Sequence, residues 1–362
     1  MSVAAQVLDL AAGRDHSLVL RSGAQLVGWG GDGTGRFPAP LGVCSAPSSE
    51  SGAVYVPTDV ELRHITASAG MSLALDAQGV AYVWGANRAG LGGRLSHIVA
   101  QQPKPLAGLP ALAQLRGSEF FTLARARDGG LYHWGLAPGS AQARNAGPLR
   151  VAGVPAITDC CAGVAHALLL DGAQRVWGWG ANTAGQLGAG HLQDYSEPTR
   201  VPMPRKMVAV AAGASHSLAI DVRGQVWAWG SNQHGQLGER APAYRTAPHQ
   251  VALPEGATQV AAGQYVSYAL GRSGRLYAWG WNARGQLGQG HTEVLHGVQV
   301  LAHLPSLKKI VAGQGHVLVS DGWHVWAWGD NRAGQLGQAA LYQATPRKLD
   351  DAVSINHEET RT

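Results

Sequence analysis

The dipeptide Trp-Gly recurs seven times along the 362 residues at a nearly constant interval. Successive copies are separated by 55, 50, 45, 50, 50 and 49 residues, and they begin at Trp29, Trp84, Trp134, Trp179, Trp229, Trp279 and Trp328. A fixed period of this length indicates a repeat architecture, in which one unit cannot bury its own faces and must pack against its neighbours.

Two further motifs keep the same interval. An Ala-Ala-Gly element followed by His-Ser-Leu, as in residues 211–218, precedes Trp-Gly, and Gly-Gln-Leu-Gly follows it in units four to seven. Short apolar runs broken by glycine turns predict four strands in each unit, which is a propeller blade. We therefore expect an all-β protein, a seven-bladed β-propeller of four-stranded blades that forms a single domain over residues 1–362. The 50 glycines and the charged fraction of 14% suit many tight turns.

The two ends of the chain are expected to close the ring, because an open ring would leave unpaired strand edges. The first apolar run is Val7 to Leu10 and the last is Pro346 to Leu349. We expect these runs to meet in one shared blade, with residues 352–355 as a competing strand. Unit one also contains an insertion at 38–60 that is rich in Pro, Ser and Gly, and it is equally compatible with a functional loop and with a tolerated surface loop.

The motifs in combination resemble the repeat of the regulator of chromosome condensation family. The pattern is Ala-Ala-Gly-x-x-His-Ser-Leu, then Trp-Gly-x-Asn-x-x-Gly-Gln-Leu-Gly, then Pro-x-x-Val, and it is degenerate in units one to three. The resemblance implies a seven-bladed propeller. It leaves the function open, because members of this family include nucleotide exchange factors for a small GTPase, a plant ultraviolet-B photoreceptor, ubiquitin-ligase accessory domains and a secreted β-lactamase inhibitor. The tryptophans that light sensing would require after Ala-Ala-Gly are missing here.

Composition and motifs argue against several classes of protein. The net charge is +5 and no run of five or six Lys or Arg occurs, so nucleic-acid binding is not expected. Three cysteines, no secretory signal and no long apolar stretch predict a cytoplasmic protein without a membrane anchor, and we expect a monomer. The chain lacks phosphate-loop, nucleophile-elbow and zinc-binding patterns, which predicts no enzyme activity, no cofactor and no metal.

Side chains that occupy the same position in several units are expected to play the same structural role in each blade. The histidines at equivalent positions are predicted to be buried and to bond a neighbouring backbone turn; they are His16, His166, His216 and His316. The seven tryptophans of Trp-Gly are predicted to fill the core between blades.

The variable positions of the repeat are the best candidates for binding. Two residues between Ala-Ala-Gly and His-Ser differ from unit to unit, and the predicted contacts with a partner protein are Arg14, Asp15, Glu119, Phe120, Gln264, Tyr265 and Gln314. Phe120 and Tyr265 are the expected apolar anchors, whereas Phe121 fits either an anchor or the core of a degenerate blade. The sequence thus predicts a non-enzymatic scaffold, an adaptor, inhibitor or regulator, that binds another protein through one propeller face. The alternative is a guanine-nucleotide exchange factor for a small GTPase.

Overall fold

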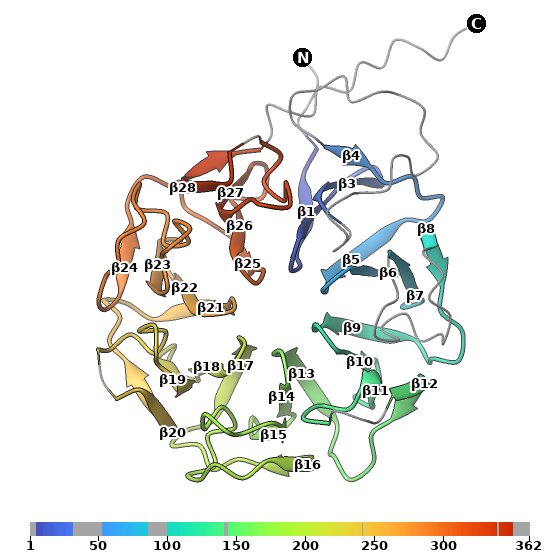
Figure 1. Cartoon of the computed structure of the whole chain (residues 1–362). Helices are drawn as coiled ribbons and strands as arrows, with labels where there is room; N and C mark the ends of the chain where they lie inside the picture. The colour runs from blue at the N-terminus through green and yellow to red at the C-terminus, as the bar shows by residue number, and fades with distance from the viewer. Residues whose placement is uncertain are drawn as a thin grey trace, which may run out of the picture.

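The computed structural model describes residues 5–31, 53–85, 100–140, 144–240, 242–338 and 340–349. Their regular elements are strands, which form seven four-stranded antiparallel sheets arranged as blades around a central axis (Figure 1). The prediction of an all-β, seven-bladed propeller is confirmed. No helix long and apolar enough to cross a membrane occurs in the described ranges.

The blades follow one another along the chain. Blade 1 contains β1 (Val7–Ala12), β2 (His16–Arg21), β3 (Gln25–Gly30) and β4 (Val54–Tyr55), and blade 2 contains β5 (Leu62–Ala67), β6 (Met71–Asp76), β7 (Ala81–Gly85) and β8 (Ala100–Pro105). Blade 3 contains β9 (Leu112–Gly117), β10 (Phe121–Ala126), β11 (Leu131–Leu136) and β12 (Arg144–Arg150). Blade 4 contains β13 (Ile157–Ala162), β14 (His166–Asp171), β15 (Val176–Gly180) and β16 (Tyr195–Arg200). Blade 5 contains β17 (Met207–Ala212), β18 (His216–Asp221), β19 (Val226–Ser231) and β20 (Tyr244–Val251). Blade 6 contains β21 (Ala257–Ala262), β22 (Val266–Gly271), β23 (Leu276–Gly280) and β24 (Gln299–Leu301), and blade 7 contains β25 (Lys309–Ala312), β26 (His316–Ser320), β27 (Val325–Asp330) and β28 (Tyr342–Lys348).

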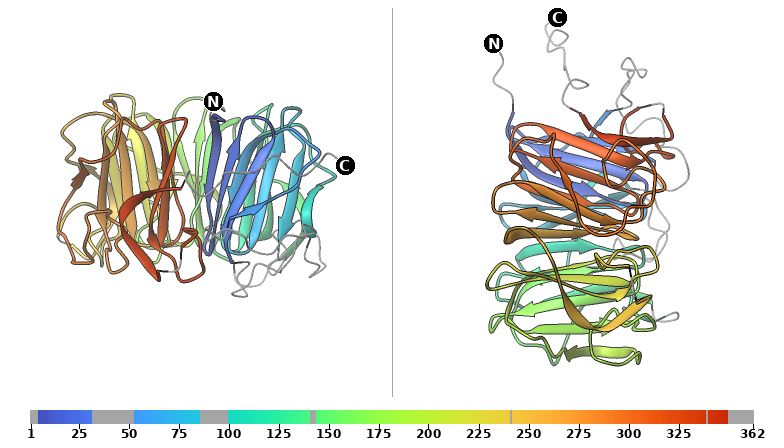
Figure 2. Two further views of the ribbon diagram at one scale, coloured as in Figure 1. Left: turned by 90° about the horizontal axis from the view of Figure 1, so that it is seen from above. Right: turned by 90° about the vertical axis from the view of Figure 1, so that its left-hand side faces the viewer.

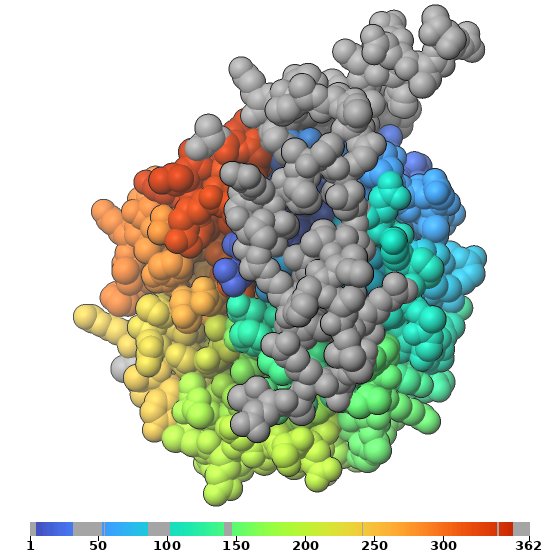
Figure 3. Space-filling view, turned by 45° about the vertical axis from the view of Figure 1, so that its right-hand side comes forward, coloured from blue at the N-terminus to red at the C-terminus, as the bar shows by residue number. Residues whose placement is uncertain are grey.

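The first strand of every blade lies nearest the axis and the fourth lies at the rim (Figure 1). Seen from the side, the molecule is a disc whose strands run from one face to the other (Figure 2). In the space-filling view the colours succeed one another around the rim in chain order (Figure 3). Because consecutive strands are antiparallel, the loops between first and second strands all emerge on one face.

The seven Trp-Gly tryptophans lie in the core, as predicted, and each is at most 4% exposed. The glycine that follows lets the backbone turn where no side chain would fit. At Gly230 φ is +97°, and a Cβ would lie 2.5 Å from the carbonyl oxygen of Ser215. Only glycine adopts this conformation at little cost.

Neighbouring blades are joined by a repeated hydrogen-bond chain, which we call the latch. Between blades 4 and 5, His166 Nε2 lies 2.9 Å from the hydroxyl of Ser217, and that hydroxyl donates to the carbonyl of Gln186 at 2.7 Å. Trp229 Nε1 donates to the same carbonyl at 2.8 Å. Since the serine proton goes to the carbonyl, the histidine is the donor at Nε2. The histidine–serine pair recurs as His216–Ser267, His316–Ser17 and His16–Ser72.

The latch corrects one detail of the histidine prediction. All four histidines are buried, as expected, but their partner is a serine hydroxyl of the next blade and not a backbone turn. Burial lowers the imidazole pKa to about 4 at His16 and to about 3 at His166, His216 and His316. The four rings are therefore neutral in the folded protein at pH 7.

The histidine of the latch packs against the glycine of Ala-Ala-Gly, where a larger residue would not fit. This close packing predicts that Gly213→Ala destabilises the protein. A Cβ at Gly213 would overlap the ring of His216 and would lie 2.5 Å from the carbonyl oxygen of Gly263 in the next blade. Because the obstacle includes backbone, we expect the variant to lose about 1–3 kcal/mol of unfolding free energy, measured by urea denaturation. Gly172→Ala is the matched control, since nothing lies within 4 Å of its Cβ position. Equal stability of the two variants would contradict the role assigned to Gly213.

The ring closes where blade 7 meets blade 1. The amide of Val7 donates to the carbonyl of Gly322 at 2.9 Å, and His316 binds Ser17 across this junction. The prediction of a blade shared by both termini is wrong, because β1 to β4 and β25 to β28 each form a complete sheet. Each unit already supplies four strands in order, so neither end of the ring needs a strand from the other.

The segment 38–60 is only partly an insertion. Val54–Tyr55 forms β4, the outer strand of blade 1, and Val56 is buried in the core. Residues 38–52 lie outside the described residues.

Candidate functional site

The loops between first and second strands surround one mouth of the central channel. The first variable residue of each pair lines this mouth, at Arg14, Ala69, Glu119, Val164, Ala214, Gln264 and Gln314. Four predicted contact residues, Arg14, Glu119, Gln264 and Gln314, are thus brought together from blades 1, 3, 6 and 7, although they span 301 residues of sequence from 14 to 314.

Glu119 bridges the mouth. Its Oε1 accepts a hydrogen bond from Arg14 Nη1 at 3.1 Å, and its Oε2 accepts one from Gln314 Nε2 at 3.0 Å. The Arg14 side chain is 46% exposed, so this ion pair adds little to stability. The bridge instead presents paired charges on the surface of this face.

Asp15 lies beside the bridge, with Oδ2 3.2 Å from Nε of Arg14. Burial raises the pKa of the Asp15 carboxyl, Arg14 opposes that rise, and the nearby carboxylates of Asp330 and Glu119 reinforce it. Asp330 is itself paired with Arg332, whose Nε donates to Oδ1 and whose Nη2 donates to Oδ2 of the carboxylate. Opposite charges therefore alternate across the junction of blades 7 and 1.

An aromatic group crosses the junction of blades 5 and 6 on the same face. The ring of Tyr265 lies 4.7 Å from the ring of His234 and 6.0 Å from that of Trp281, measured between centroids. Gln264 Nε2 donates to the Tyr265 hydroxyl at 3.3 Å. All three rings are half-buried, so each keeps part of its surface open to solvent.

The two phenylalanines of blade 3 separate. Phe120 is 37% exposed at the end of its loop, whereas Phe121 is 1% exposed and packs in a core cluster with Leu123, Leu169 and Trp179. Phe121 is therefore a core residue, and Phe120 remains available on the face. Phe120 belongs to blade 3 and Tyr265 to blade 6, and these two blades lie on different sides of the ring (Figure 1).

Sequence reasoning missed Trp281, His234 and the Asp330–Arg332 pair. The signal for two of them was present, because the residue after Trp-Gly is Gly31, Ala86, Leu136, Ala181 or Ser231 in five units but Trp281 and Asp330 in the others. His234 gives no such signal, since the corresponding turn position varies.

No metal site is found in the described part of the chain, where no three His, Cys, Asp or Glu side chains are grouped to hold an ion. Cys160 and Cys161 are free and buried, and burial raises the pKa of the Cys160 thiol to about 12. A thiol of that pKa is inert near neutral pH.

Comparison with known proteins agrees with this architecture. Residues 174–220, 223–270 and 273–320 match the model of the regulator of chromosome condensation (RCC1) repeat, and a second model of this repeat matches residues 207–236 and 257–286. The crystal structure of human WBSCR16 is similar, with a TM-score of 0.77, 20% identity and coverage of 89% of this chain and 92% of that one. Prp20p from Saccharomyces cerevisiae has a TM-score of 0.68 and 22% identity, with 77% and 75% covered.

Structural similarity at these low sequence identities establishes the fold alone. The matches to the repeat models identify the family to which the matched repeats belong. Propellers of this repeat type are typically binding or regulatory domains. The chain is a seven-bladed β-propeller in which residues 174–320 match repeats of the regulator of chromosome condensation family.

Proposed function

We propose that this protein is a scaffold or regulator that binds a partner protein through the face bearing the channel mouth, without catalysis. The observation that carries the proposal is the placement of partly exposed aromatic side chains on loops whose equivalents hold small residues. Phe120 and Tyr265 replace Gly70, Ala165, Ser215 or Gly315 of other blades. Aromatic and arginine side chains supply most of the binding energy at protein interfaces.

The charges on this face would add specificity to the aromatic contacts. Arg14, Asp15 and Glu119 are partly exposed and mutually paired, so a partner must offer complementary charges to avoid leaving them unpaired. Crystal structures of a similar propeller, yeast RCC1 (Prp20), include one in which it is bound to Kap60. We propose by analogy that this propeller also engages a protein.

The test compares aromatic side chains on opposite faces of the propeller. Trp281 lies on the mouth face, whereas Trp323 is 45% exposed in the loop between β26 and β27, which emerges on the other face. In capture from native lysate followed by quantitative mass spectrometry, we expect a partner retained by wild type and Trp323→Ala. Tyr265→Ala combined with Trp281→Ala should weaken its binding about 30-fold, the equivalent of about 2 kcal/mol at a hot spot.

Both variants should keep the wild-type melting temperature within a few degrees, so that lost capture reports the surface and not the fold. Equal capture by the double variant and wild type would show that the docking face has been wrongly assigned. Loss of capture with Trp323→Ala alone would move the interface to the opposite face.

Nucleotide exchange is the second candidate, and it rests on the repeat family together with Prp20p, which was described with binding to Gsp1p and histones. Measuring the release of labelled GDP from a panel of small GTPases separates the two functions. Acceleration of release that is lost in the double variant would establish exchange through the same face. No acceleration across the panel would leave the scaffold function alone.

A further inference from the structure

The central channel contains a cavity of about 390 Å³ beneath the mouth. A collar of small residues, one from each blade, lies between the mouth and the cavity and lines both. Its members are Ala12, Ala67, Gly117, Ala162, Ala212, Ala262 and Ala312. The cavity is within the volume range of small-molecule sites.

The wall of this cavity is asymmetric. At equivalent positions of the repeat on the inner strands, blades 7, 1, 2 and 4 place Lys309, Asp9, His64 and Asp159 around the axis, whereas blade 5 places Ala209 there. Two positions further on, six of the seven blades carry an uncharged residue of modest size, and only blade 3 carries a charged one, Arg116. Arg116 therefore stands out against its own repeat.

Asp9 contacts two basic side chains of the cavity wall, Lys309 and His64. Its carboxylate contacts Lys309 Nζ, lies 2.6 Å from His64 Nδ1 and accepts the amide of Ile65 at 2.9 Å. Burial alone would raise the pKa of the Asp9 carboxyl, but His64 and Lys309 outweigh burial and hold the pKa well below its ordinary value. Asp9 thus joins blades 7, 1 and 2, because both of its carboxylate oxygens contact groups of the neighbouring blades.

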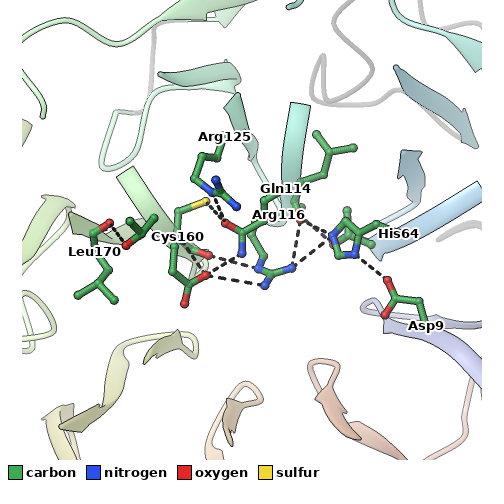
Figure 4. Close-up of polar contacts among 12 residues, drawn as sticks. Asp9, His64, Gln114, Arg116, Arg125, Cys160 and Leu170 are labelled. Atoms are coloured by element: carbon green, nitrogen blue, oxygen red, sulfur yellow. Dashed lines mark hydrogen bonds and ion pairs between the residues drawn. The ribbon is translucent and has the colours of Figure 1, made fainter. Parts of the chain in front are cut away.

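Arg116 is paired less closely with a carboxylate, since its one printed ion pair, with Asp159, is at the limit of contact. Its Nε donates to the carbonyl of Cys160 at 3.2 Å and its Nη1 to that of Leu115 at 3.3 Å, with His64 Nε2 3.4 Å away (Figure 4). The nearest carboxylate oxygen, Oδ1 of Asp159, is 4.0 Å from Nη2, beyond hydrogen-bond distance. The same oxygen of Asp159 already accepts hydrogen bonds from Gln114 Nε2 at 2.7 Å and from the amide of Cys160 at 2.9 Å.

We propose that the cavity binds a small oxyanion, a carboxylate or phosphate group, through the guanidinium of Arg116. Arg116 lines the cavity, and its Nη2 makes no hydrogen bond to the described residues beyond the long ion pair with Asp159. The planar guanidinium matches the geometry of an oxyanion. Two blades further on, the wall is lined by the small side chains of Ala209 and Ala211, which take up little of the cavity. The site is separate from the partner face, because the collar lies between them.

The experiment titrates the full-length protein with inorganic phosphate, and in a second arm with succinate, by isothermal titration calorimetry at pH 7.5. Potassium chloride at matched ionic strength corrects for non-specific screening. We expect saturable binding by at least one of the two anions, with a matching rise in melting temperature. Arg116→Gln should weaken the binding at least tenfold, whereas Arg63→Gln, which removes an exposed arginine paired with Glu61, should leave it unchanged.

Asp159→Asn gives a change in the opposite direction. Removing this negative charge beside Arg116 should tighten the binding several-fold, because a carboxylate repels the incoming anion. If Arg116→Gln has a lowered melting temperature, Arg116→Lys serves as a second variant, because it keeps the positive charge but not the planar guanidinium. It thereby separates anion binding from the stabilising contact that Arg116 makes between blades 3 and 4. No binding by wild type, wild-type affinity in Arg116→Gln, or no gain in Asp159→Asn would each overturn the proposal.

Discussion

Lowering the pH from 7.5 to 5 should unfold this protein or bring it close to unfolding, through the four latch histidines. Their folded pKa values are about 4 for one and about 3 for the other three, against an ordinary value of 6.5. At pH values between the folded and the unfolded pKa, the unfolded chain binds protons that the folded chain does not. The stability that the neutral histidines contribute is therefore fully present well above pH 6.5 and is lost as the pH falls below it.

The size of the effect follows from the linkage relation. At pH 5 each histidine costs about 2 kcal/mol, and the four together about 8 kcal/mol, which is comparable to the whole stability of a typical domain. Asp9 does not contribute in this window, because its depressed pKa removes stability only as the pH falls below its unfolded value near 4. Urea denaturation at half-unit steps of pH measures the slope.

The chain contains its own control for this experiment. Blade 6 has Val266 at the histidine position and blade 7 has Val317 at the serine position, and both are buried. Replacing His216 and Ser267 together by valine copies that apolar junction, and the carbonyl of Gln236 keeps its bond from Trp279. We expect the loss of about a quarter of the pH dependence that the four latch histidines supply, while His133 and His249, whose pKa values burial also lowers, keep their contributions. An unchanged slope would show that the latch is not its origin.

Deleting residues 1–10 should abolish cooperative folding or lower the melting temperature by more than ten degrees, on the order of several kcal/mol. The deletion removes most of β1, which pairs with β2 and packs against both β25 and β5. It removes Val7 and Leu10 from a core shared with Leu318 and Leu349, worth about 1.5–3 kcal/mol each. It also leaves Lys309 and His64 without Asp9.

Two further chains separate the causes in thermal melts followed by circular dichroism. Removal of residues 1–4 leaves every residue of β1 in place and should have little effect. Asp9→Asn keeps the strand but removes the charge, and a smaller loss than that of the deletion would assign the difference to packing and strand pairing. A melting curve of the deletion variant that overlays wild type would refute closure of the ring through β1.

The fold could be derived from sequence because its determinants are local and repeated seven times. Alternation of apolar residues defines strands, glycine defines turns, and a period near 50 residues forces each unit against the next. The burial of Trp229 and His216 followed from the same logic, since a side chain repeated by symmetry does the same task in each blade. Phe121 remained ambiguous, because a phenylalanine at a histidine position fits either a core or a surface.

The partners of these side chains were decided only by the tertiary structure. The family match from 174 to 220 begins ahead of β15 in blade 4 and ends in β18 of blade 5, so one sequence repeat spans two blades. It contains both Gln186 and Ser217, which bind each other across the junction. The repeat therefore preserves a contact between blades, and a strand-by-strand reading of a single unit does not reveal it.

Sequence alone determined the repeat, the strands, the core tryptophans and the variable loop positions of this protein. Only the closed ring brought Glu119 to Arg14 and Gln314, 105 and 195 residues away, and aimed Arg116 into the channel. It also placed Trp281 against Tyr265 and His234. The physical reason is that strand and turn preferences act over a few residues, whereas contacts around the axis depend on the curvature of seven packed blades, to which every unit contributes.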